Sequence, residues 1–280
     1  MDIPENATHR YISDTFPQYH HDILLNLHQE YSLSGKRILD VGGSNIPSEF
    51  MRDLEVKQFI CLDPITKWVG FHSNAALPTT KYGKKIYSKD AIVSSLPDEF
   101  CFIVDVDIED AGALFDDYFD IIVSISTFEH VTNIRECLQT IYKFLHSGGI
   151  LHSQYEPVFS SPMGHHCYLD KDINFVNLRE LDNIHLLYTK GVAREFIHET
   201  FDWPDDIKET VLRQIYDSPI INRKTINDHV LEIMNSPFNK YSFEYFSCAP
   251  SSPFIQARLN EKLGFMRFDV RGIKLRCIKD

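Results

Sequence analysis

The chain has no uninterrupted apolar run that approaches the roughly 18 residues of a membrane-spanning helix. Its first ten residues, MDIPENATHR, lack the apolar core of a signal peptide. Acidic residues outnumber basic residues. The sequence has 40 Asp and Glu and only 28 Lys and Arg, which give a formal net charge of -12. Proteins that grip nucleic acid through its phosphates carry a basic surface. We therefore expect a cytoplasmic protein with no membrane span and no nucleic-acid partner.

Closely spaced cysteines are missing as well. The six cysteines occupy positions 61, 101, 137, 167, 248 and 277, and no two of them form a CxxC pair. This spacing excludes the usual structural zinc sites and a disulfide framework. We expect buried, reduced thiols and no metal site.

The sequence does contain an alternation of short apolar runs and helical patterns. Ile23, Leu27 and Tyr31 mark a helix over 17–33, and a stronger 3.6-residue period predicts another over 133–146. Continuous apolar runs are typical of strands that helices cover on both faces. Together they predict a doubly wound α/β sheet. The expected strands are 37–41, 58–62, 100–106, 119–125, 150–155, 241–247 and 273–278.

The alternation of strand and helix patterns stops between residues 157 and 240. Ile207, Val211 and Ile215 mark one amphipathic helix there, and a second follows over 226–233. A connection of this length exceeds an ordinary crossover, so we expect an α-helical cap insertion. The basic run Lys81, Lys84, Lys85 and Lys89 is interpreted as a solvated loop.

A glycine-rich turn follows the first strand, in the run Asp40-Val41-Gly42-Gly43-Ser44. Glycine lets the backbone approach a ligand that a Cβ would exclude. The dinucleotide pattern GxGxxG is not met, because Ser44 and Pro47 occupy its second and third glycine positions. No YxxxK pair occurs either, which argues against a nicotinamide-dependent enzyme. Asp63 and Asp107 follow the second and third strands, where acidic side chains can reach a bound ligand.

Four segments occur in order over residues 35–156: GKRILDVGGS, CLDP, FDIIVSISTFEHV and FLHSGGIL. Together they resemble the class I methyltransferases that use S-adenosylmethionine, in the type-11-like small-molecule branch. The resemblance implies a Rossmann-like, seven-stranded, mostly parallel sheet with helices on both faces. It also implies S-adenosyl-L-methionine as the cofactor. The GHH run at 164–166 further resembles methyltransferases associated with bacterial surface polysaccharides.

The resemblance assigns residues to the parts of the donor. Asp63 binds the ribose, and Ser126 offers backbone near the sulfonium. Asp107 and Ile108 hold the adenine. The first turn, with Asp40, Gly42, Gly43 and Ser44, lines the methionine end. Glu129 and His130 are expected to cap and orient the following helix.

The acceptor side is expected after the fifth strand. Glu156 ends that strand, and His165 and His166 follow. Transfer to a hydroxyl benefits from a base, and histidine suits this task at neutral pH. His165 and His166 are therefore the leading general-base candidates, with Glu156 as a carboxylate alternative. Roles for the two histidines in acceptor binding or in structure remain open, and a metal site ranks last because no third ligand occurs at a recognisable spacing.

These expectations divide the chain into four parts: an N-terminal helical lid over 1–34, a donor-binding core over 35–156, an acceptor-binding insertion over 157–240 and final strands over 241–280. The favoured reaction is O-methylation of a sugar or similar small polar acceptor by in-line displacement. The alternatives are N-methylation of a small amine, a nicotinamide-dependent oxidoreductase or epimerase, and a non-catalytic binding module.

Overall fold

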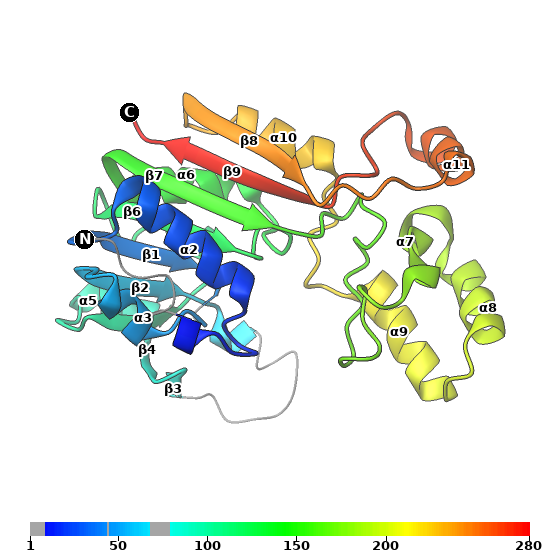
Figure 1. Ribbon diagram of the computed structural model, residues 1–280, viewed down its shortest axis with the longest axis horizontal. Coiled ribbons are helices and arrows are strands. Elements are labelled where there is room, and N and C mark those ends of the chain that lie inside the picture. Colours follow the sequence, from blue (N-terminus) through cyan, green and yellow to red (C-terminus); the bar gives the residue numbers. More distant parts are fainter. Residues whose placement is uncertain (1–8, 44, 68–78) are drawn as a thin grey trace.

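The computed structural model describes residues 9–43, 45–67 and 79–280. Among these residues, nine strands form a single sheet in the order β3-β4-β5-β2-β1-β6-β7-β9-β8 (Figure 1). The strands are β1 (Arg37–Val41), β2 (Gln58–Leu62), β3 (Thr80–Lys81), β4 (Lys84–Ser88), β5 (Cys101–Asp105), β6 (Phe119–Ile125), β7 (Leu145–Tyr155), β8 (Lys240–Phe246) and β9 (Gly272–Ile278).

Within the run β4-β5-β2-β1-β6-β7, every pair of adjacent strands is parallel. Antiparallel pairs occur only at the two ends of the described sheet, where β3 pairs with β4 and β9 lies between β7 and β8. The chain order reverses between β1 and β6, and ligands of such sheets bind at the carboxyl ends of the strands beside this point. The mostly parallel Rossmann-like sheet expected from the sequence is confirmed.

The count of strands differs from the expected seven because β3 and β4 extend the sheet beyond β5. They occupy the lysine-rich run that the sequence suggested was a solvated loop, and this interpretation is wrong for Lys84. That side chain is 1% exposed, and its Nζ donates to the Ile46 carbonyl at 2.6 Å. The long lysine stem can pack along apolar surface while its ammonium finds an acceptor. Charge pattern alone does not reveal such a burial.

Helices cover both faces of the sheet, because successive strand residues point to opposite sides. Leu39 and Val41 pack in one apolar cluster with α6 and α10, whereas Ile38 packs in the other with α2 and α3. The N-terminal helix expected over 17–33 is confirmed as α2. The helices beside the sheet are α2 (Gln18–Tyr31), α3 (Ser48–Asp53), α5 (Lys89–Ser94), α6 (Ile134–Phe144) and α10 (Ile226–Met234), with 3-10 turns at His9–Tyr11 and Ile108–Asp110.

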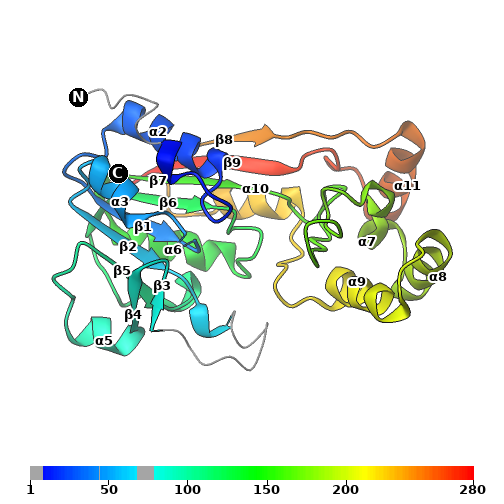
Figure 2. The same cartoon turned by 60° about the horizontal axis from the view of Figure 1, so that its bottom comes forward.

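A second group of helices lies beyond the carboxyl ends of the strands (Figure 2). It has its own apolar cluster, which includes Ile197, Leu212 and Ile215. The group comprises α7 (Ile184–Leu187), α8 (Lys190–Thr200), α9 (Asp205–Asp217) and α11 (Pro253–Leu263), with a 3-10 turn at Arg179–Leu181.

The helices expected in 157–240 are thus divided between two places. Helix α10 joins the core beside α6, through Ile226 and Ile233. Helix α11 comes from the connection between β8 and β9, yet its Leu259 packs with Leu186 and Leu187 around α7. The division of the chain into four parts therefore stays a prediction.

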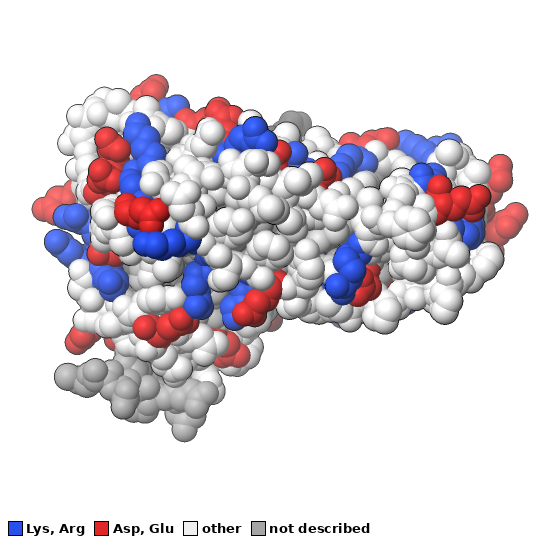
Figure 3. All heavy atoms as spheres, turned by 90° about the horizontal axis from the view of Figure 1, so that it is seen from above, with Lys and Arg blue, Asp and Glu red and all other residues white. Residues whose placement is uncertain are grey.

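The described surface carries both signs of charge. Figure 3 shows Lys and Arg interspersed with Asp and Glu, without a continuous basic stripe over the described part of that face. No described helix is long and apolar enough to cross a membrane.

Candidate active site

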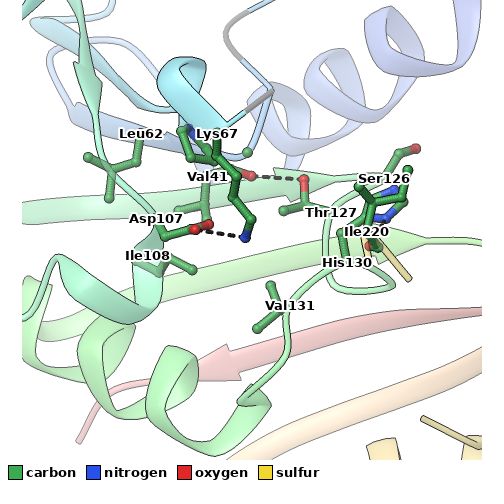
Figure 4. A pocket seen from close by; sticks show the side chains of 12 residues that line it. Val41, Leu62, Lys67, Asp107, Ile108, Ser126, Thr127, His130, Val131 and Ile220 are labelled. Atoms are coloured by element: carbon green, nitrogen blue, oxygen red, sulfur yellow. Dashed lines mark hydrogen bonds and ion pairs between the residues drawn. The ribbon is translucent and has the colours of Figure 1, made fainter. Parts of the chain in front are cut away.

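A cavity opens at the carboxyl ends of β1, β2, β5 and β6 (Figure 4). It encloses about 500 Å³ of empty space, part of it open to solvent, and we call it the donor cavity. Its lining residues are Val41, Gly42, Leu62, Pro64, Lys67, Asp107, Ile108, Ser126, Thr127, His130, Val131 and Ile220.

The glycine turn forms the floor of the donor cavity. Gly42 has φ +88°, and its N–H donates to the Leu62 carbonyl at 2.7 Å. A Cβ at this position would lie 2.1 Å from Thr127 Cγ2, so no larger residue fits without movement. Thr127 is itself fixed, because its hydroxyl donates to the Val41 carbonyl at 3.1 Å. Only glycine combines this backbone conformation with this contact.

Asp40 and Gly43 lie behind the same turn. The Asp40 side chain is buried, and a Cβ on Gly43 would lie 2.9 Å from its Oδ2. Neither residue lines the donor cavity directly. Ser44, the fourth residue assigned to this turn, lies outside the described residues.

The two acidic strand ends are both held by lysines. Asp63 is 2% exposed, and its Oδ2 accepts a hydrogen bond from Lys81 Nζ at 2.7 Å. Asp107 lines the cavity together with Ile108 and accepts from Lys67 Nζ at 2.8 Å. Figure 4 shows Lys67 reaching toward Asp107 on one side of the cavity. Two carboxylates and an apolar wall therefore stand at the ends of β2 and β5.

Ser126 stands at the end of β6 with φ +53°, a conformation uncommon for residues other than glycine. Its N–H donates to the Gln154 carbonyl at 2.9 Å, and its hydroxyl lies 3.3 Å from the Tyr19 hydroxyl of α2. The N-terminal segment also reaches the glycine turn, since Asn45 Nδ2 donates to the Thr15 carbonyl at 2.7 Å. The first helix thus lies over the methionine end expected from the sequence.

Glu129 and His130 do not cap α6, contrary to expectation. Asn133 is the N-cap, and its side chain accepts from the Glu136 N–H at 3.3 Å. Glu129 is instead 2% exposed; burial raises the pKa of its carboxyl well above the ordinary value, and the nearby charge of Glu156 raises it further. His130 Nδ1 donates to the Ile220 carbonyl at 2.9 Å, and its ring lines the donor cavity.

The acceptor-side candidates separate in the structure. His166 lies 5.3 Å from His130 between ring centroids, and burial lowers its pKa to about 3. His165 instead packs against His185, with ring centroids 5.6 Å apart, and burial lowers its pKa well below 6.5. Glu156 Oε2 lies 3.6 Å from an Arg271 guanidinium nitrogen. The structure therefore brings His166, and not His165, beside the donor cavity.

Several lining residues were not identified from the sequence. Pro64 and Lys67 lie one and four residues after Asp63, and Thr127 and Val131 lie within the STFEHV run. Their positions near expected site residues were a usable signal. Ile220 had no such signal. It belongs to the segment after α9 and reaches the cavity only because the chain folds back between α9 and α10.

The donor cavity fits S-adenosyl-L-methionine by its chemistry. At Gly42 the floor of the cavity is bare backbone, because a Cβ there would clash with Thr127. Apolar walls from Leu62 and Ile108 suit a flat adenine ring, and the Asp107 carboxylate suits hydroxyl or amino groups. When bound, this cofactor supplies an electrophilic methyl group on a sulfonium.

Comparisons with known proteins agree with this assignment. Residues 39–153 match the family described as methyltransferase domain. No curated protein sequence matches the chain significantly.

Solved structures with a similar fold include three methyltransferases. An S-adenosylmethionine-dependent methyltransferase from Mesorhizobium loti is 14% identical, with 91% of this chain and 96% of that chain covered and a TM-score of 0.45. One from Archaeoglobus fulgidus is 13% identical, with 99% and 100% covered and a TM-score of 0.47. Phosphoethanolamine N-methyltransferase 2 from Haemonchus contortus is 12% identical, with 99% and 57% covered and a TM-score of 0.47. At such scores these similarities carry no weight for the chemistry of this chain.

The family match spans Gly42, Asp107 and Ser126, which line the donor cavity, and it also includes Asp63. Residues 39–153 therefore form a methyltransferase domain, for which S-adenosyl-L-methionine is the methyl donor.

Proposed function

We propose that the enzyme methylates a hydroxyl of a sugar or a similar small polar acceptor. The supporting observation is a set of three side chains, Glu129, Glu156 and His166, which we call the acceptor cluster. Each has a buried polar atom (Oε2, Oε2 and Nε2) without a hydrogen-bond partner in the described chain. Leaving such an atom unsatisfied costs about 1–3 kcal/mol. A ligand rich in hydroxyls, which both donate and accept hydrogen bonds, meets this demand.

The acceptor cluster adjoins the donor cavity. Tyr19 connects them, because its hydroxyl lies 3.3 Å from Ser126 and the charges of Glu129 and Glu156 both raise its pKa. In this arrangement Ser126 faces the sulfonium, and an acceptor bound at the cluster lies on the far side of the methyl group. Placing the two reactants in line supplies a large part of the rate acceleration in such a displacement.

We assign the remaining residues to parts of the methyl donor as the sequence led us to expect. Asp63 is assigned to the ribose hydroxyls, and Asp107 with Ile108 to the adenine. Asp40, Gly42 and Gly43 are assigned to the methionine end. Helix α2 acts as the lid over that end, as the contacts of Tyr19 and Asn45 support.

His166 is the histidine that we assign to the loss of the hydroxyl proton. Its Nδ1–H donates to the Gly164 carbonyl at 3.0 Å, so its Nε2 carries a lone pair. His165 has the opposite tautomer, because its Nδ1 accepts the Cys167 N–H at 3.1 Å and its Nε2 therefore carries the hydrogen. A neutral imidazole with a protonated Nε2 cannot accept a proton there. The tautomers therefore favour His166 over His165 as the general base.

Release of S-adenosylhomocysteine tests the proposal, with UDP-glucose and methyl glucoside as hydroxyl probes and glucosamine as an amine probe. The variant His166→Asn suits the left-handed backbone at this residue, whose φ is +50°. We expect turnover with a hydroxyl probe, and a loss of about 10²-fold or more in kcat for His166→Asn. His165→Asn is the matched variant and should keep kcat within about tenfold.

Turnover with the amine probe alone, unaffected by His166→Asn, would instead support N-methylation, because a neutral amine needs no strong base. Binding of NADH in place of the donor would point to a nicotinamide enzyme. Donor binding without any turnover, unaffected by both histidine variants, is the result for a binding module. A cytoplasmic location and the absence of a nucleic-acid partner remain predictions from the sequence.

A further inference from the structure

We infer that Glu129, His130 and His166 together bind a divalent first-row transition-metal cation beside the donor cavity. This cation would bind the acceptor hydroxyl and make its proton more acidic. The inference rests on the proposed O-methylation, but it makes His166 a cation ligand, so that Glu156 in place of His166 receives the proton. We call the three residues the cation triad.

The three ligand atoms converge in space. One atom from each member of the cation triad lies within 4.8 Å of the other two. Glu129 and His130 come from the connection between β6 and α6, and His166 comes from the loop after β7. The sequence led us to expect no metal site, because these positions match no ligand spacing. The parallel pairing of β6 with β7 is what brings the two loops together.

Both histidines are oriented in the way that metal ligands require. His130 Nδ1 donates to the Ile220 carbonyl at 2.9 Å, and His166 Nδ1 donates to the Gly164 carbonyl at 3.0 Å. Histidines that bind metals usually donate the other ring N–H to a carbonyl or carboxylate, which fixes the tautomer. In both rings the lone pair is therefore on Nε2. With this tautomer, the two Nε2 atoms cannot hydrogen-bond to each other, because neither carries a hydrogen, but both can coordinate a cation.

Independent evidence for a bound cation comes from the Glu129 side chain. Its side chain is 2% exposed, and its Oε2 has no hydrogen-bond partner in the described chain. A buried carboxylate is costly unless a cation or hydrogen bonds compensate it. His166 Nε2 is likewise buried without a partner. A cation at the centre of the triad satisfies both atoms at once.

The ligand set indicates the class of cation. Two imidazoles and one carboxylate suit Zn²⁺, Fe²⁺, Co²⁺ or Mn²⁺, whereas Mg²⁺ and Ca²⁺ prefer oxygen ligands. Three protein ligands leave a position for a substrate oxygen, as in catalytic sites. The nearby Glu156 carboxylate adds negative charge that favours a cation and can receive a proton.

In the methyl-transfer step, the acceptor oxygen binds the cation, its O–H bond breaks, and the proton goes to Glu156. The oxygen forms a bond to the donor methyl carbon while the carbon–sulfur bond breaks, and neutral S-adenosylhomocysteine leaves. A bound cation lowers the pKa of a coordinated hydroxyl or water strongly. Positive charge on the sulfonium disappears in the same step.

Titration of chelator-treated enzyme with Co²⁺ tests the inference, because coordinated Co²⁺ absorbs visible light. The variants are Glu129→Gln and His166→Asn, both close in shape to the native residues. His198→Gln is the matched control, since His198 forms a surface cluster with Asp205 and Glu209 at 3.7 and 3.6 Å. Affinity for S-adenosylhomocysteine, measured for every variant, verifies that each one is folded.

We expect one Co²⁺ per wild-type chain. Loss of a second-shell partner alone weakens metal binding about 10–100-fold. Loss of a ligand in Glu129→Gln or His166→Asn should therefore weaken Co²⁺ binding by at least about 100-fold, while His198→Gln binds normally. Zn²⁺ or Mn²⁺ should restore methyl transfer to the chelator-treated enzyme.

Two results would overturn the inference. One is the absence of Co²⁺, Zn²⁺ and Mn²⁺ binding by folded enzyme, and the other is binding that survives both triad variants. If chelator-treated enzyme still methylates a hydroxyl, the cation is dispensable and the proposed O-methylation stands with His166 as general base. If Co²⁺ binds as expected but no hydroxyl probe turns over, the proposed function fails and the cation site stands.

Discussion

Lys81 on β3 donates a hydrogen bond to the Asp63 carboxylate at the end of β2, with 2.7 Å between Nζ and Oδ2. The carboxylate assigned to the ribose is therefore compensated and oriented by a side chain from the β3–β4 hairpin. A buried carboxylate without such a partner would be costly.

Asp63→Asn should weaken donor binding. The variant keeps the shape of the side chain but loses the charge that strengthens hydrogen bonds to the ribose. Hydrogen bonds to a charged group are worth about 1.5–3 kcal/mol, which corresponds to about ten- to hundredfold in Kd. Calorimetric titration with S-adenosylhomocysteine measures the change. Asp117→Asn, on the surface beside Lys279, is the control and should bind normally. Unchanged affinity in Asp63→Asn would remove the ribose assignment.

Gly42→Ala should destabilise the fold and impair donor binding. The new Cβ meets both a positive φ and the Thr127 side chain at 2.1 Å. We expect a loss of about 2–4 kcal/mol in the free energy of unfolding, measured by urea denaturation. Gly35→Ala provides the comparison, because Gly35 has φ +71° but no atom within 4 Å of its Cβ position. Equal losses in the two variants would show that the Thr127 contact is unimportant.

Tyr19→Phe should reduce donor affinity modestly. Burial raises the pKa of Tyr19, so its hydroxyl stays protonated at neutral pH and can share a hydrogen bond with Ser126. Loss of one such bond costs about 0.5–1.5 kcal/mol, or about two- to tenfold in Kd. Tyr168→Phe, at an exposed site, is the matched variant. A wild-type Kd in Tyr19→Phe would mean that α2 does not close over the donor.

Acidification should destabilise the enzyme partly through His152. Burial lowers the pKa of this histidine to about 4, and the charges of Arg276 and Lys274 contribute. Since the unfolded chain binds the proton near pH 6.5, the contribution of His152 to stability is complete above that pH. It is lost as pH falls from 6.5 toward 4, by up to about 3 kcal/mol.

The slope of unfolding free energy against pH checks this prediction. His152→Gln should flatten the slope between pH 6.5 and 4. His146 provides a control of opposite sign, because its hydrogen bond to Asp120 raises its pKa. Its contribution is present below pH 6.5 and is lost as pH rises above that value. An unchanged slope in His152→Gln would contradict the assigned burial effect.

The sheet shows where local pattern is informative and where it is not. Strands such as 37–41 and 58–62 were predictable because their apolar runs must be buried on both faces. The β3–β4 hairpin was not, because its short strands carry several lysines and owe their pairing to the exposed edge of β5. Lys84 is buried only because that edge places it over Phe59 and beside the Ile46 carbonyl.

The sequence by itself predicted part of the donor cavity. Gly42, Asp107, Ile108 and Ser126 all line one cavity, because each follows a strand of a parallel sheet and such strand ends meet at one edge. Only the tertiary structure brings together the side chains that we propose for the acceptor. Glu129 and His166 meet because β6 pairs with β7, and backbone carbonyls select the histidine tautomers. Hydrogen bonds formed between segments distant in sequence leave no local pattern, so only the folded chain distinguishes His166 from His165.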